Sequence, residues 1–283
     1  SEWNPPQLTQ FSPPENANHG EILLKMLARP NIASKETWVR QYDHEVIAQT
    51  AVKPFVGVER DGPGDAGLIA PIHGSTHGIV VSCGINPRYS DIDAGAMAAA
   101  SIDEAVRNAV CVGVDIDKIA GLDNFCWPDP IESEKTPDGK FKLAQLVRAN
   151  RELERVCRAY KLPCVSGKDS MKNDYGKGEN KISIPPTLLF SLFGDHPDVR
   201  MTATSDLKDA GERLYLVGDS MEELGASELS FMFRDEDSSI GIGGNVPSLP
   251  NPENNLNTYR TLSRTIRQGL VKTSHDCSEG GLG

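Results

Sequence analysis

The chain has 283 residues, of which 38% are hydrophobic and 24% charged, the composition of a globular protein that can bury a core. Its 29 Lys and Arg residues and 40 Asp and Glu residues give a formal net charge of −11. Nucleic acids and anionic membranes require a basic face, and no apolar run has the roughly 18–20 residues of a membrane span. We therefore expect a cytoplasmic protein that binds neither nucleic acid nor membranes.

The first 52 residues are predicted to form an extended arm and linker with short helices. Ser1–Gly20 is rich in Pro and Asn, which is typical of an extended segment. Apolar residues at helical spacing predict a helix over Glu21–Arg29, which Pro30 ends. Ser34 is placed to cap a second short helix that runs to Val39.

Residues 53–205 are predicted to form the first folded domain, in which a strand pattern follows the Gly-rich turn Asp61–Asp65. The predicted strands are Gly67–Pro71, His77–Cys83, Ile119–Leu122, Leu162–Val165 and Thr187–Phe193. Two long helices are predicted, Ala94–Val112 and Phe141–Tyr160. The apolar face of the first is formed by Met97, Ile102, Ala105, Val106, Ala109 and Val110. The apolar face of the second is formed by Leu143, Leu146, Val147, Leu153, Val156 and Tyr160. Asp103 and Arg107 form a supporting i,i+4 pair. This order of elements predicts an α+β layered sandwich.

Residues 206–283 are predicted to belong to a second, partial α/β domain. The polar segment Asp195–Asp206 marks the boundary, and Leu214–Gly218 starts the new unit. Arg234–Asn257 is acidic and then rich in Gly, Pro and Asn, so we expect a long mobile insertion. A final helix is predicted near Tyr259–Val271.

The six cysteines form no CxxC pair, which excludes a disulfide framework and a zinc knuckle. Four of them, Cys83, Cys111, Cys157 and Cys164, lie within apolar runs. Free cysteine is among the most buried residue types, so we expect these four to be buried, reduced thiols.

Oxygen-bearing side chains near turns and helix ends are the first candidates for chemistry. Glu104 and Asn108 are four residues apart on a predicted helix, so they share one face, and Mg²⁺ prefers such oxygen ligands. The alternative is an ordinary solvated face. Asp65 ends the Gly-rich turn, where an Asp is also explained by hydrogen bonds to its own backbone.

Two further segments have the composition of phosphate-binding sites. His275, Asp276 and Ser278 precede two glycines at a predicted helix start, where backbone N–H groups bind anions. Ser166–Ser170 (SGKDS) follows a predicted strand, and its Gly, Lys and Ser suit a phosphate contact although it is not a Walker A loop. The alternative for this segment is an exposed turn.

These motifs together resemble a known enzyme family. The segments are SCGINPRYSDID (Ser82–Asp93), SIDEAVRN (Ser101–Asn108), LDNFCWPDP (Leu122–Pro130), SGKDSMKN (Ser166–Asn173) and HDCSEGG (His275–Gly281). They resemble phosphoribosylformylglycinamidine synthase, and specifically the second of the two repeated halves of its synthetase. The resemblance extends from about Pro30 to the last residue.

The resemblance implies a fold of the aminoimidazole-ribonucleotide-synthetase type, in which the first domain forms a β-barrel with a partner domain. It also implies an ATP-dependent carbon–nitrogen ligase of purine biosynthesis that uses glutamine as amide donor. The substrate, formylglycinamide ribonucleotide, is phosphorylated on its amide oxygen, and ammonia then displaces the phosphate. The implied partners are the other half of the synthetase and a glutaminase, and the implied cofactors are Mg²⁺ and ATP or ADP.

Matching the motifs residue by residue gives two sets of site residues. The Mg-nucleotide site of the half itself is implied at Gly64, Asp65, Glu104, Asn108, Asp276 and Ser278, with Asp65, Glu104, Asn108 and Asp276 as metal ligands. A site shared with the other half is implied at Asp123, Gly167, Lys168 and Ser170. No catalytic residue is assigned, because the family's catalytic His lies in the other half. Lys168 also departs from short-chain relatives and is expected to contact phosphate instead of metal.

The chain is predicted to be a fragment, because Gly280–Gly283 should open a further helix, and we expect it to be inactive alone. Its unpaired strand face, with Ile79 and Val81, predicts a homodimer; the alternative is a monomer whose Ser1–Gly20 arm covers that face. Two other functions stay open. One is a non-catalytic nucleotide-binding half, and the other is a selenophosphate synthetase or thiamine-phosphate kinase of the same superfamily.

Overall fold

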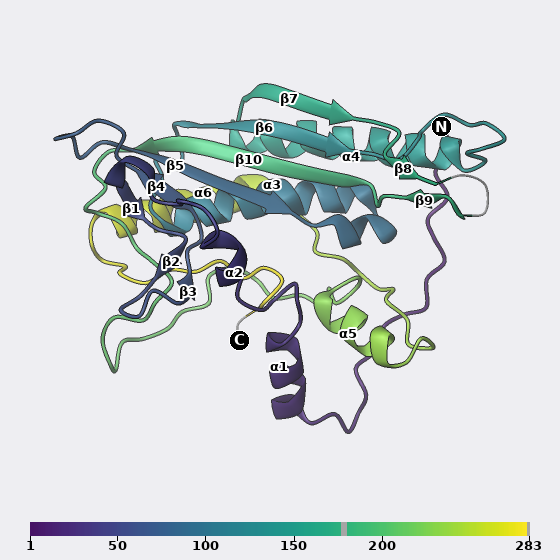
Figure 1. Cartoon of the computed structure of the whole chain (residues 1–283), viewed down its shortest axis with the longest axis horizontal. Coiled ribbons are helices and arrows are strands. Elements are labelled where there is room, and N and C mark those ends of the chain that lie inside the picture. Colours follow the sequence, from purple (N-terminus) through teal and green to yellow (C-terminus); the bar gives the residue numbers. More distant parts are fainter. Residues whose placement is uncertain (177–179, 282–283) are drawn as a thin grey trace.

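The computed structural model describes residues 1–176 and 180–281, and its central feature is a six-stranded mixed sheet (Figure 1). The strand order is β1-β4-β5-β10-β6-β7. These strands are β1 (Thr50–Val52), β4 (Gly67–Ile69), β5 (Gly78–Ile85), β6 (Ile119–Cys126), β7 (Cys164–Ser170) and β10 (Thr187–His196). Short strands form two separate ribbons, β2 (Phe55–Val56) with β3 (Gly62–Pro63) and β8 (Asp174–Tyr175) with β9 (Ile182–Ser183). The helices are α1 (His19–Leu27), α2 (Glu36–Val39), α3 (Ala94–Cys111), α4 (Gly139–Tyr160), α5 (Glu228–Glu236) and α6 (Pro252–Arg267), with 3-10 turns at Val46–Ala48 and Pro87–Asp91.

One face of the sheet is covered and the other is open. Along β5, buried residues such as Val80 and Ser82 alternate with Ile79 and Val81, which are 43% and 46% exposed. This alternation is typical of an antiparallel sheet that packs on one side only. Strand β10 pairs antiparallel with both β5 and β6, and β7 is added to β6 in the parallel direction.

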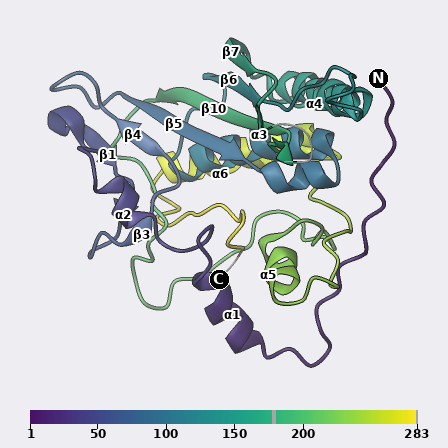
Figure 2. The same ribbon diagram turned by 45° about the vertical axis from the view of Figure 1, so that its right-hand side comes forward.

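Helices α3, α4 and α6 lie together on the covered face (Figures 1 and 2). The apolar face predicted for α3 is confirmed: its residues Met97, Ile102, Ala105, Val106, Ala109 and Val110 are at most 1% exposed. The helix lies close to β5, because a Cβ on Gly84 would be 2.0 Å from the backbone oxygen of Ser101. Glycine at this position brings the residues of α3 against the end of β5.

The buried face of α4 differs from the prediction. Val156 and Tyr160 are buried as expected, but Leu143 and Val147 are 37% and 36% exposed. The helix also buries small residues such as Ala149, because it packs closely on the alanine-rich α3. Close helix packing selects small side chains, which an apolar stripe of large residues does not predict.

The carboxyl-terminal third is more closely packed than expected. The predicted insertion Arg234–Asn257 is not a free loop, since Ile242 and Val246 are buried. Helix α6 begins at Pro252, earlier than predicted, and its Leu256 belongs to the main core. Leu214–Gly218 has no regular secondary structure and is largely exposed.

The amino-terminal arm runs beside α4 and α5 before α1, away from the open face of the sheet (Figure 2). The Trp3 ring stacks on Phe141 with centroids 5.4 Å apart, and the buried Phe11 lies 6.1 Å from Phe233. The alternative in which this arm covers the open face is therefore wrong for the structure described.

The structure confirms the predicted layers of helices and sheet, and it shows that the sheet is mixed. The barrel with a partner domain and the boundaries 1–52, 53–205 and 206–283 stay predictions. The helix expected at the chain's end includes Leu282 and Gly283, which lie outside the described residues. Within the described residues, no helix is both long and apolar enough to cross a membrane.

Candidate functional site

The carboxylate of Asp65 lies next to the last described residues of the chain. A Cβ on the preceding Gly64 would be 2.4 Å from the backbone oxygen of Lys53, so this tight approach requires glycine. The Asp65 side chain is 1% exposed, and its Oδ1 accepts hydrogen bonds from Nδ1 of His275 at 2.7 Å and from the backbone N–H of Asp276 at 3.1 Å. Its buried Oδ2 has no hydrogen-bond partner among the described residues.

Asp65, His275 and Asp276 form a compact group whose potential ligand atoms all lie within 4.8 Å of one another. The hydrogen bond to Asp65 raises the pKa of His275. Burial raises the pKa of Asp276. The positive charge of Arg107 opposes this rise, and the negative charge of Asp65 adds to it. A buried carboxylate with a raised pKa gains free energy from any cation that binds beside it.

Glu104 adds a third carboxylate to this region. It projects from α3 toward the end of β5, where its Oε2 accepts hydrogen bonds from the backbone N–H of Ile85 and from Nδ2 of Asn86, both at 2.9 Å. Burial raises the pKa of Glu104 to about 7, and the negative charge of Asp276 adds to the effect. The region therefore has more negative charge than its own cations balance.

A buried polar network holds Asp276 in place. The predicted Asp103–Arg107 ion pair is present, and Arg107 also lies 3.4 Å from the carboxylate of Asp276. The Asp103 carboxylate accepts hydrogen bonds from the hydroxyls of Tyr160 and Tyr259, the latter at 2.8 Å. Helices α3, α4 and α6 are thereby linked to the cluster.

The remaining residues of this predicted set lie around the cluster. Nδ2 of Asn108 donates to the backbone oxygen of Cys83 at 3.0 Å, one turn of α3 beyond Glu104. Ser278 is exposed, and its backbone oxygen accepts from Gly281 at 3.0 Å. The sequence prediction left His275 out of the ligand set. The position of His275 next to Asp276 is a sequence signal for a ligand, but only the fold brings His275 to Asp65, 210 residues away.

Asp123 and Gly167 of the second predicted set face each other across β6 and β7. A Cβ on Gly167 would be 3.0 Å from both carboxylate oxygens of Asp123, so glycine leaves room for the carboxylate. Burial raises the pKa of Asp123, and the negative charge of Asp169 adds to this shift.

The prediction that Ser166–Ser170 forms a loop is wrong, because these residues continue β7 as the edge strand beside β6. Lys168 is exposed on this edge, and the Ser170 hydroxyl donates to Oδ1 of Asn173 at 3.0 Å. The polar side chains of the segment do not indicate a strand, because the hydrogen bonds that join it to β6 are made by the backbone.

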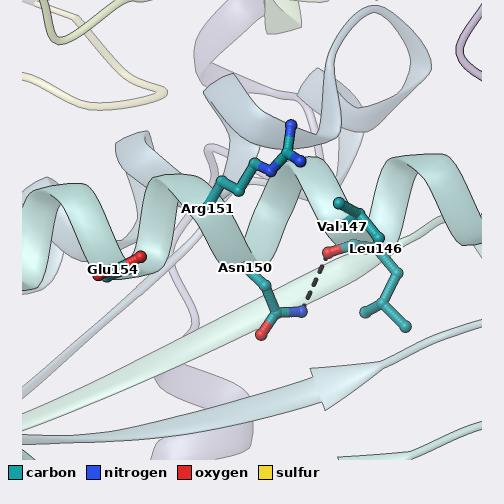
Figure 3. Close-up of a pocket in the computed structure, with 5 residues that line it drawn as sticks. All are labelled: Leu146, Val147, Asn150, Arg151 and Glu154. Atoms are coloured by element: carbon teal, nitrogen blue, oxygen red, sulfur yellow. Dashed lines mark hydrogen bonds between the residues drawn. The ribbon is translucent and has the colours of Figure 1, made fainter.

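A shallow hollow of about 360 Å³ lies on α4 and contains none of the predicted site residues (Figure 3). Its lining is Leu146, Val147, Asn150, Arg151 and Glu154. Asn150 donates to the backbone oxygen of Leu146 at 3.0 Å, an ordinary contact within the helix. We assign no role to this hollow.

Comparison with known proteins agrees with the motifs. Residues 63–185 match the family described as AIR synthase related protein, N-terminal domain. The chain is 34% identical over 269 residues to phosphoribosylformylglycinamidine synthase subunit PurL of Deinococcus radiodurans, and 35% identical over 274 residues to that of Anaeromyxobacter sp. (strain Fw109-5). The alignments cover 93% and 95% of this chain. The chain is a relative of phosphoribosylformylglycinamidine synthase.

The chain spans about one third of these synthase subunits, 33% and 32% of their lengths. A solved structure, T. maritima PurL complexed with AMPPCP, has a TM-score of 0.47 and 20% identity, and the match covers 72% of this chain and 28% of that one. The relationship to the synthase rests on the sequence relatives, which confirm the resemblance drawn from the motifs.

Proposed function

We propose that this chain is part of a phosphoribosylformylglycinamidine synthase and that it binds a magnesium nucleotide at the acidic cluster of Asp65, Glu104 and Asp276. The observation that carries the proposal is a set of three carboxylates. Asp65 and Asp276 have ligand atoms within 4.8 Å of each other, and Glu104 is close enough for the charge of Asp276 to contribute to its raised pKa. Two of them have pKa values raised by burial, and Asp65 has a buried oxygen with no partner among the described residues. Such an arrangement costs free energy unless a cation binds.

The residues fit Mg²⁺ by their chemistry. This ion prefers oxygen ligands, which the three carboxylates supply, and it keeps open positions for water and phosphate oxygens. Asn108 offers a further oxygen, since its amide nitrogen is already used as a donor. When bound, Mg²⁺ would neutralise phosphate charge. His275 is a positioning residue in this proposal, because its hydrogen bond orients Asp65.

The proposed reaction is the formation of formylglycinamidine ribonucleotide, as the relatives' name indicates. The dependence on ATP and the use of glutamine as amide donor come from the motif resemblance and are parts of the proposal. A glutaminase partner and a cytoplasmic location are parts of this proposal. Gly64 allows the close approach of the Asp65 turn, and the Arg107 network keeps Asp276 in position. Ser278 and the following glycines are proposed to contact phosphate.

The β6–β7 edge is proposed to contribute to a second site, shared with the part of the synthase that this chain does not span. Asp123 supplies a carboxylate beside Gly167. Lys168 and Ser170 alternate with Gly167 along β7, so they supply a cation and a hydroxyl on the other face of this sheet edge. The cation and the hydroxyl suit a phosphate, and the carboxylate suits a metal ion. Formylglycinamide ribonucleotide and ATP are the proposed ligands.

Nucleotide binding is tested by thermal unfolding of the chain with and without Mg-ADP. At a hundredfold excess over Kd, a ligand that binds only the folded state adds about 2.7 kcal/mol to the free energy of unfolding. We expect a clear rise in the unfolding temperature, which Glu104→Ala largely removes. Glu154→Ala, on the exposed side of α4, is the matched control and should keep the full shift. Equal shifts in both variants would contradict the assigned site.

The open face of the sheet is proposed to bind the rest of the synthase, and in the isolated chain a second copy. Ile79, Val81, Ile85 and Phe193 expose 38–46% of their surface on this face. Contiguous apolar surface of this kind marks an interface, and a stable one buries at least about 1,000 Å². The motif resemblance implies that the two halves of the synthase are related by pseudo-twofold symmetry, and we propose that a twofold dimer places one copy in each position.

The dimer is tested by light scattering coupled to size exclusion over about 1–50 µM protein. We expect the mass of two chains, and Val81→Asp should produce monomer or insoluble material, because its carboxylate would be buried without a partner. Val58→Asp is the control, since Val58 is 96% exposed and lies outside the sheet. A wild-type mass of one chain across the whole range would reject the dimer.

A further inference from the structure

Two cysteines lie side by side where α4 ends and β7 begins. The Sγ atoms of Cys157 and Cys164 are 3.9 Å apart. Cys164 is exposed and Cys157 is partly buried, so the prediction that both are buried is wrong for Cys164, as it is for Cys83. The short loop between α4 and β7 turns Cys164 outward at the edge of the sheet.

The chain between the two cysteines is a tight helix-ending turn. The backbone N–H of Leu162 donates to the oxygen of Cys157 at 2.9 Å, and that of Lys161 donates to Arg158 at 3.2 Å. Lys161 has the left-handed conformation, with φ of 54°. This is the hydrogen-bond pattern of a Schellman motif, which orders the end of a helix.

The sheet holds the other side of the pair. The backbone oxygen of Pro163 accepts a hydrogen bond from Gly121 of β6 at 2.9 Å, directly before Cys164. Cys157 is therefore held by the helix and Cys164 by the sheet. Their closeness results from ordered backbone. Once one of the two sulfurs carries a mixed disulfide, the other thiol attacks that disulfide more readily than a thiol of a separate molecule does.

A shallow hollow of about 470 Å³ gives small molecules access to both sulfurs. Its lining residues are Leu153, Glu154, Cys157, Arg158, Lys161, Leu162, Pro163 and Cys164. Arg158 is paired with the Glu154 carboxylate at 3.2 Å, and the negative charge of Asp123 contributes to the raised pKa of both thiols. Lys161 is therefore the cation that the lining offers to a small anionic reactant, such as a peptide disulfide of the glutathione type.

We propose that Cys157 and Cys164 form a reversible intramolecular disulfide by exchange with a small anionic peptide disulfide. In the first step, the Cys164 thiolate attacks one sulfur of the peptide disulfide, which forms a mixed disulfide and releases one peptide thiolate. In the second step, the Cys157 thiolate attacks the Cys164 sulfur and releases the second peptide thiolate. Two protein thiols are oxidised and one peptide disulfide is reduced to two peptide thiols.

The order of the steps follows from exposure, because the peptide disulfide reaches Cys164 first. Burial raises the pKa of both thiols, so little of the reactive thiolate is present at neutral pH and the exchange is expected to be slow. Where reductant is abundant, we expect the pair to stay reduced. Closing the bond requires the two Sγ atoms to approach by about 2 Å, from 3.9 Å to the usual disulfide length near 2.05 Å.

The test is incubation of the native chain with oxidised glutathione, followed by peptide mapping in a mass spectrometer. We expect a Cys157–Cys164 cross-link that lacks two hydrogen atoms and is reversed by dithiothreitol. Stable glutathione on Cys164 with a free Cys157, or no loss of either thiol, would overturn the proposal. Mapping the wild-type chain makes this result independent of the folding of any variant.

Serine variants then separate the two steps. Cys157→Ser should keep glutathione bound on Cys164, because no second thiol displaces it, and Cys164→Ser should leave both positions without glutathione. Cys126→Ser is the control and should form the cross-link at the wild-type rate. An unchanged cross-linking yield in Cys157→Ser would show that another cysteine is the partner and would reject the pair.

Discussion

In the complete synthase to which we propose this chain belongs, Asp123→Ala is expected to lower turnover by about 10²–10³-fold, the usual loss when one polar contact to the transition state is removed. The reason is the proposed role of its carboxylate beside Gly167 in the shared site. Folding should be preserved, because the side chain is only partly buried and its pKa is raised, so it stabilises the fold little. The measurement is the rate of product formation with saturating ATP, substrate and ammonium.

Asp117→Ala is the matched control for this experiment. Asp117 precedes the same strand and forms an exposed ion pair with Arg260 at 2.7 Å, so its loss should leave turnover near the wild-type value. A wild-type rate in Asp123→Ala would refute the assignment of this residue to the shared site. Because ammonium replaces glutamine, the result does not depend on a glutaminase.

The second large effect is expected on stability without metal. Glu104→Gln should raise the free energy of unfolding at pH 8 by about 1–3 kcal/mol, since one unit of pKa shift corresponds to about 1.4 kcal/mol. The folded-state pKa of Glu104 is about 7 against an ordinary value of 4.5, so the folded state binds the proton more tightly. Its contribution to stability is therefore present below pH 4.5 and is lost as the pH rises toward 7. A glutamine at this position does not titrate, so the variant does not lose stability as the pH rises, and its side-chain oxygen can still accept hydrogen bonds from the N–H groups of Ile85 and Asn86.

The measurement is urea unfolding of the wild type and the variant at pH 5 and pH 8 with a chelator present. Only the difference between the two proteins is used, because other groups such as the buried His196, whose pKa is lowered by burial, titrate in both. An equal difference at the two pH values would contradict the raised pKa. The same variant should lose the Mg-ADP shift, so stability and binding would change in opposite directions, as is common for functional residues.

The sequence by itself determined the family, the main elements and most of the polar residues of the candidate site. The helical spacing of Met97, Ile102 and Val106 predicted a buried face of α3 that the structure confirms, because local periodicity and burial agree in a long amphipathic helix. Asp65, Glu104 and Asp276 were identified together through the motif resemblance, since a carboxylate at a turn or on a helix face is common by itself.

Only the tertiary structure decided how these residues meet. The pairing of His275 with Asp65 joins positions 210 residues apart, and no local pattern encodes such a contact. The assignment of Ser166–Ser170 to β7 depends on backbone hydrogen bonds to β6, which are independent of side-chain polarity. The raised pKa of Glu104 and the meeting of Cys157 with Cys164 arise in the same way, because burial and closeness are set by the packing of α3, α4 and the sheet.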